Sequence, residues 1–223
     1  FKQVFAVAEA AGISNPSVEL AHMPFGTILG KDNKPFKTRE GALIKLSELL
    51  DEAIARASKL LQDREVQSKN PDIDDAELAD LAEIIGIGAV KYADLSKNRT
   101  SDYVFDWDQM LSFDGNTAPY LLYAYSRTRS IFTRGGIDLI ALPERVVTEN
   151  EAERRLAVAI AGYQDLLEQV AREGYPHQLC AYLYELAGRF TQFYEQCPIL
   201  TSDDATKTRR LTLTKQTGDV LAN

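Results

Sequence analysis

From Thr117 to Asn223, apolar residues recur at the spacing of an amphipathic helix, and this pattern limits the possible folds more than any other feature. The pattern breaks at glycine and proline residues such as Gly174 and Pro198, which commonly end helices. The second half of the chain is therefore predicted to be a helical bundle. Its helices are expected near residues 117–134, 149–159, 162–173, 177–196 and 203–222.

The first half of the chain mixes helical and extended patterns. Residues 1–12 have helical spacing. Residues 17–29 alternate and then become continuously apolar, which predicts a strand buried in a parallel sheet. Residues 103–108 alternate between apolar and acidic side chains and are predicted to be extended.

Two further helices are expected between these extended segments. The first follows Gly41, with Ser47 as its cap. The second starts at Asp74 or Asp75, and Gly86 and Gly88 are expected to interrupt it. The composition changes between Asp114 and Thr117, so we expect an α/β domain over residues 1–114 and an all-α domain over residues 115–223.

Composition excludes several classes of protein. The 223-residue chain has no apolar run near the roughly 20 residues that a membrane-spanning helix needs. Its net charge of −8 argues against a general nucleic-acid coat protein, although a local basic face could still bind RNA. Two cysteines, Cys180 and Cys197, favour a reducing compartment over a disulfide framework. The two histidines lie far apart in the sequence, which makes a zinc site unexpected.

A basic loop follows the predicted strand, between Gly30 and Gly41. It carries four cations, which are Lys31, Lys34, Lys37 and Arg39. Cations on a glycine-bounded loop can follow the charge that develops on a polyphosphate. The alternative is an ordinary solvated loop between a strand and a helix. The sequence alone favours a structural role for His22, just upstream, as a histidine hydrogen-bonded at the start of the strand.

A second candidate site lies at the start of the predicted bundle. Helical spacing brings Tyr120, Tyr123, Arg127 and Ser130 near one helix face. An aromatic ring beside a guanidinium suits a stacked nucleobase and its phosphate. The alternative is that the tyrosines pack the bundle core. Another basic stretch, residues 206–215, is interpreted as a largely solvated helix face.

These stretches carry a resemblance to a known family. Residues 22–41, the stretch from Gly86 to Phe132 and the tyrosine-rich tail resemble, in this order, the C-terminal half of bacterial arginyl-tRNA synthetases. The resemblance implies part of a class I Rossmann-like catalytic domain, followed by an α-helical anticodon-binding bundle. It implies an enzyme that activates arginine with ATP and Mg²⁺ and esterifies it to tRNA(Arg). We expect a cytoplasmic monomer without membrane contact.

The resemblance also implies roles for individual residues. The basic loop resembles the second signature of the class, usually Lys-Met-Ser-Lys-Ser, although Thr38 stands where a lysine is expected. The implied catalytic residues are Lys34, Lys37, Thr38 and Arg39. Backbone ahead of the loop is implied to line the adenine, at His22, Gly26, Thr27 and Ile28. The implied tRNA contacts are Tyr120, Tyr123, Arg127 and Tyr194.

The first class signature, a histidine pair written HxGH, does not occur in the sequence. Because the chain also opens at Phe1 within a helical pattern, we expect it to be a piece of a longer protein that cannot form arginyl-adenylate alone. Two alternatives remain, a non-catalytic tRNA-binding module and a helical protein-interaction domain. The basic loop distinguishes the enzyme from a non-catalytic tRNA-binding module. The Tyr/Arg helix distinguishes both of these RNA-binding hypotheses from a protein-interaction domain.

Overall fold

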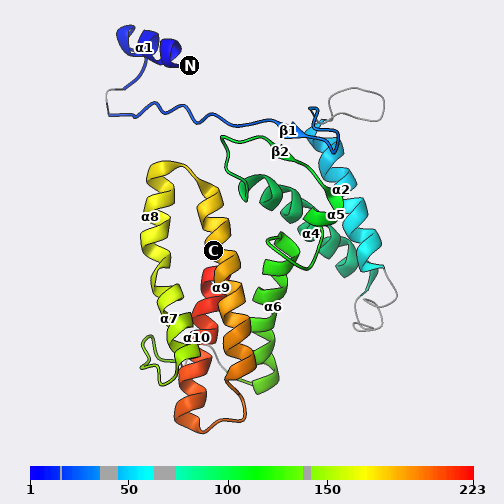
Figure 1. The fold of residues 1–223 in the computed structure, drawn as a ribbon, viewed down its shortest axis with the longest axis vertical. Coiled ribbons are helices and arrows are strands. Elements are labelled where there is room, and N and C mark those ends of the chain that lie inside the picture. Colours follow the sequence, from blue (N-terminus) through cyan, green and yellow to red (C-terminus); the bar gives the residue numbers. More distant parts are fainter. Residues whose placement is uncertain (16, 36–44, 63–73, 138–141) are drawn as a thin grey trace.

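The computed structural model describes all residues except 16, 36–44, 63–73 and 138–141. Among the described residues, the first part of the chain contains two small strands and four helices, and a helical bundle forms the other end of the molecule (Figure 1). The elements of the first part are α1 (Lys2–Ala10), β1 (Ile28–Leu29), α2 (Leu46–Leu61), α4 (Asp75–Leu95), β2 (Tyr103–Val104) and α5 (Trp107–Met110). The bundle contains α6 (Ala118–Gly135), α7 (Glu151–Ala161), α8 (Tyr163–Glu173), α9 (Pro176–Gln196) and α10 (Asp204–Ala222).

The extended segments are shorter than their sequence patterns predict. β1 and β2 pair in parallel, with Ile28 opposite Tyr103, so the predicted parallel geometry is confirmed. The predicted strand over residues 17–29 is otherwise wrong, because no strand in the described part of the chain runs beside residues 17–25. The extended prediction for residues 103–108 fails at Trp107, where α5 begins. Asp106 caps that helix by accepting from the backbone N–H groups of residues 108 and 109.

α2 and α4 pack closely and form most of the core of the first part. The predicted interruption at Gly86 is wrong, since α4 is continuous from Asp75 to Leu95. A Cβ atom at Gly86 would lie 2.7 Å from the Ile54 backbone nitrogen, so this glycine permits the close approach of the two helices. Asp74 caps α4 as predicted, whereas the cap of α2 is Lys45 and not Ser47.

The bundle helices confirm the predicted pattern, with ends within two residues of those expected. Gly136 and Gly174 follow α6 and α8 in the left-handed conformation that glycine adopts easily. α10 lies in the centre of the bundle and packs against α6, α7 and α9 (Figure 1). Because neighbouring helices surround α10, residues on several of its faces are buried. The buried apolar residues of the bundle core are Ile131, Phe132, Leu156, Leu186, Phe190, Phe193, Cys197, Ile199, Leu211, Leu213 and Val220.

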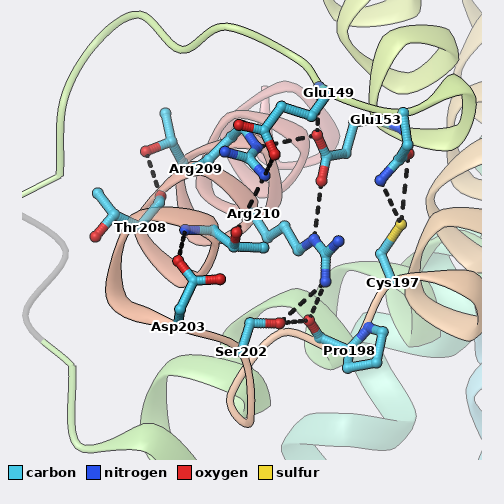
Figure 2. Close-up of polar contacts among 12 residues, drawn as sticks. Glu149, Glu153, Cys197, Pro198, Ser202, Asp203, Thr208, Arg209 and Arg210 are labelled. Carbon is cyan, nitrogen blue, oxygen red and sulfur yellow. Dashed lines mark hydrogen bonds and ion pairs between the residues drawn. The ribbon is translucent and has the colours of Figure 1, made fainter.

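The basic stretch of α10 is not the solvated face that its sequence suggested. Arg209 is 8% exposed, and its Nε donates to Glu153 at 3.0 Å. Arg210 donates to the other oxygen of Glu153 at 2.8 Å and also reaches the Pro198 carbonyl (Figure 2). The prediction failed because Glu153 is 56 residues away from Arg209 in the sequence, so the ion pair exists only in the folded bundle.

Glu153 is fully buried and joins α7 to α10. Burial alone would raise the pKa of its carboxyl, but the Glu149 backbone N–H and the two guanidiniums hold the pKa below the ordinary value. Its backbone N–H donates to the side chain of Asn150, which also contacts the buried thiol of Cys197. Both cysteines are free and buried. Within the described residues, no helix is long and apolar enough to cross a membrane.

Candidate functional site

Three of the four predicted RNA-contacting residues meet on the surface of the bundle. Tyr123 and Arg127 lie one turn apart on α6, and Tyr194 comes from α9. The Arg127 guanidinium carbon is 4.8 Å from the centre of the Tyr123 ring and 5.3 Å from that of Tyr194. Arg127 also donates to the Tyr123 hydroxyl. The two rings and the guanidinium therefore form one cluster, which we call the Tyr123–Arg127–Tyr194 cluster.

The exposure of Tyr123 suits ligand binding better than core packing, whereas Tyr194 also packs against Phe190 of the bundle core. Tyr123 is 50% exposed, so half of its surface is open to a ligand. Arg127 and Tyr194 are half-buried, which restricts their movement. Because exposed aromatic faces can stack on bases and a guanidinium can bind phosphate, the arrangement can hold an unstacked nucleotide.

The charge environment differs between α6 and its neighbours. The α6 sequence contains no aspartate or glutamate, and none of its arginines forms an ion pair with a described residue. Arginines on α7 and α9 are instead paired within their own helices, for example Arg155 with Glu151 at 2.9 Å and Arg189 with Glu185. The positive charge of the α6 arginines is therefore more available to an anionic ligand than that of the paired arginines on α7 and α9.

Tyr120 does not join the cluster. Its ring pairs with Tyr184 of α9, with centres 5.3 Å apart, beside a cleft of about 540 Å³ whose lining includes Gly188 and Gln192. The sequence alone led us to expect Tyr184 to be a core or interface residue, and it is 39% exposed. Tyr184, Gly188 and Gln192 are spaced four residues apart, and this spacing could have indicated that they lie along one face of α9. Ser130 faces its own helix and donates to the Arg127 carbonyl.

The segment ahead of the basic loop is fixed by residues 99–105. The Gly26 N–H donates to the Arg99 carbonyl at 2.6 Å, and the Thr27 N–H donates to Asp102 at 2.6 Å. A Cβ atom at Gly26 would lie 2.3 Å from the Ser101 carbonyl oxygen, so a side chain there would collide with backbone. Gly26, Thr27 and Ile28 thus form one short, well-anchored stretch.

The other residues predicted for the nucleotide side are only partly described. His22 is exposed, and its ring stacks on Phe1 with centres 4.5 Å apart. Lys31 pairs with Asp106 at 3.0 Å, a contact that raises the pKa of Lys31 and lowers that of Asp106. Lys34 is exposed, and Lys37, Thr38 and Arg39 lie outside the described residues.

Two family models match successive parts of the chain. Residues 1–107 match the model described as "tRNA synthetases class I (R), catalytic domain". Residues 121–223 match the model described as "DALR anticodon binding domain". The order of the two matches is that of the α/β and all-α parts of the structure.

Curated relatives and solved structures agree with these matches. The chain is 53% identical to an arginine–tRNA ligase of Marinomonas sp. (strain MWYL1) and 54% identical to one of Erwinia tasmaniensis, over 99% and 98% of its length. It spans 37% of the length of each of these relatives. It is also similar to the arginyl-tRNA synthetase structures of Plasmodium falciparum (TM-score 0.77, 30% identity, 99% of this chain and 36% of that one) and Thermus thermophilus (TM-score 0.76, 26% identity, 90% and 33%).

Proposed function

The chain belongs to the arginyl-tRNA synthetase family, and from this premise we propose that it is the part of an arginine–tRNA ligase that holds the ATP phosphates and recognises the anticodon. The whole enzyme would activate arginine with ATP and esterify it to tRNA(Arg), in the cytoplasm and as a monomer. We place the boundary between the two parts at residues 114 and 115, between the matched ranges.

The observation that carries the RNA-binding role is the Tyr123–Arg127–Tyr194 cluster. It is assembled from two helices within the residues that match an anticodon-binding domain. The Tyr123 and Tyr194 rings would stack on unpaired loop bases, and Arg127 between them would neutralise a phosphate. Tyr120, paired with Tyr184 along the same two helices, would extend this contact to a neighbouring nucleotide.

The nucleotide side is proposed to begin at Gly26, Thr27 and Ile28. Their fixed backbone would line the adenine, with His22 at its edge. Lys34, Lys37, Thr38 and Arg39 would then bind the phosphates. Mg²⁺ would enter with ATP, because proteins usually bind this ion through substrate phosphates and only one or two carboxylates.

Pyrophosphate exchange in the full-length enzyme tests this assignment. Lys37→Ala should slow arginine-dependent exchange by roughly 10- to 1,000-fold, the range for losing one contact to developing charge. Lys31→Ala is a matched control, because Lys31 is already paired with Asp106 and should affect exchange little. An unchanged rate in Lys37→Ala, with a large loss in Lys34→Ala or Arg39→Ala, would reassign the phosphate ligand. Absence of arginine-dependent exchange in the wild type would refute the proposed function.

A further inference from the structure

Arg99 touches both parts of the molecule, and sequence reasoning gave it no role. Its Nη1 donates to the Pro24 carbonyl at 2.6 Å, and its Nε donates to the Gly174 carbonyl at 2.6 Å. Its guanidinium carbon lies 4.7 Å from the centre of the Tyr175 ring. The Arg99 carbonyl also accepts from the Gly26 N–H. Its Nη2 also lies 3.4 Å from the Met23 sulfur. One residue therefore contacts the N-terminal segment three times and the turn between α8 and α9 twice.

The turn is shaped to receive this contact. Gly174 has a φ of +66° and ends α8, which leaves its carbonyl free of the helix. A Cβ atom on Gly174 would lie 3.0 Å from the Met23 sulfur, so the N-terminal segment rests directly on the turn. Figure 1 shows this segment crossing above the α8–α9 turn before it reaches β1.

The contacts link the two proposed binding regions through the length of α9, about 30 Å at 1.5 Å per residue. Gly26, which is held by the Arg99 backbone, opens the stretch proposed to line the adenine. Tyr175 immediately precedes α9, the helix that supplies Tyr194 to the Tyr123–Arg127–Tyr194 cluster. Because guanidinium is planar and donates in a fixed fork, Arg99 transmits a displacement of the turn more rigidly than a lysine would.

We infer that Arg99 is a positioning residue that sets the placement of the nucleotide-lining stretch according to the position of the anticodon-side bundle. The inference rests on the proposed function for its ATP site, but its structural part stands on the contacts of Arg99 alone. The inference predicts that a substitution of Tyr175, on the bundle side, alters the placement of the nucleotide-lining stretch.

Hydrogen exchange of the present chain measures the structural part. Arg99→Ala and Tyr175→Ala should each speed exchange of the Gly26 and Thr27 amides by about 5-fold or more, because their support is loosened. Arg172→Ala is the matched control. Arg172 is an exposed arginine in the last turn of α8 that lies near Glu173 without contacting the N-terminal segment, so its loss should leave both amides unchanged.

Kinetics of the full-length enzyme measure the positioning role. Arg99→Ala should raise the KM for ATP or lower kcat for pyrophosphate exchange by about 10-fold, since small misplacements at a reacting centre are costly. Affinity for an isolated anticodon stem-loop should stay within about 2-fold of wild type, because Arg99 is remote from the cluster. Tyr175→Ala should shift the ATP parameters in the same direction, and the double variant should lose less than the sum. Arg99→Lys should restore part of the loss.

The outcomes separate the two proposals. Unchanged amide exchange in Tyr175→Ala, or additive kinetic losses, would overturn the role of Arg99 even if the wild type is a working ligase. A parallel loss of stem-loop affinity would also overturn it, by making Arg99 a support of the RNA site. If the wild type itself lacks arginine-dependent exchange, the proposed function fails and the ATP-side role of Arg99 fails with it.

Discussion

Helices α6 and α10 are both rich in basic residues, yet the fold uses their arginines in opposite ways. On α10, Arg209 and Arg210 turn into the bundle and share the buried carboxylate of Glu153 (Figure 2). On α6, Arg127 stays at the surface between two tyrosine rings, with no carboxylate partner among the described residues. An arginine that the fold has already paired stabilises the bundle, whereas one that it leaves between aromatic rings is available to an anionic ligand.

The largest effect should come from removing the carboxylate that the α10 arginines share. Glu153→Ala leaves Arg210 without a carboxylate and Arg209 with only the more exposed Glu149, at 2.7 Å; breaking a buried pair typically costs about 3–5 kcal/mol of unfolding free energy. Thermal melting of the present chain measures it. Glu151→Ala is the control, because Glu151 is exposed on the same helix and pairs only with exposed arginines. Equal melting temperatures for the two variants would show that the ion pairs of Glu153 with the α10 arginines stabilise the bundle no more than surface ion pairs do.

A smaller effect, on binding rather than folding, is expected on α6. Tyr123→Ala should weaken the binding of tRNA(Arg) by roughly one to two decades, since a stacked base contributes about 1–3 kcal/mol. Tyr123→Phe keeps the ring and loses only the hydroxyl contact with Arg127, so most of the affinity should remain. If Tyr123→Ala lowers the melting temperature strongly but binds tRNA normally while folded, the tyrosine belongs to the bundle core.

The smallest effect concerns pH and again separates the two helices. The pKa of Glu153 is lowered in the folded state, so its ionised form stabilises the bundle above the unfolded pKa of about 4.3. This contribution should disappear as the pH falls through the lower, folded-state pKa. Urea unfolding at a series of acid pH values should show a shallower decline in Glu153→Gln than in the wild type. Arg127→Ala should leave the slope unchanged, because no carboxylate in the described part of the chain pairs with Arg127.

The sequence predicted features that depend on neighbouring residues. The bundle helices were correct because their apolar spacing and their glycine and proline breaks are local signals. Tyr123 and Arg127 were placed together correctly because four residues make one helical turn. Tyr194 joined them only through the resemblance, since it lies on another helix.

The errors came from contacts between distant segments. Gly86 was expected to interrupt a helix, but its role is set by the backbone of α2 packed against it. Arg209 and Arg210 were expected to be solvated, because nothing near them in the sequence identifies Glu153 as their partner. Arg99 was missed for the same reason: Pro24 and Gly174 are each 75 residues away from it. The site residues of the basic loop remain predictions.

The most direct test of the contrast between α6 and α10 measures two properties on two variants, Arg127→Ala and Arg210→Ala. For each, the affinity for a tRNA(Arg) anticodon stem-loop and the melting temperature are measured on the present chain. Arg127→Ala should lose affinity, with a salt dependence flatter by about one phosphate contact, and keep its melting temperature. Arg210→Ala should melt several degrees lower and, while folded, bind the stem-loop as the wild type does. The reverse pattern, or loss of both properties in both variants, would contradict the assignment of α6 to RNA and α10 to the fold.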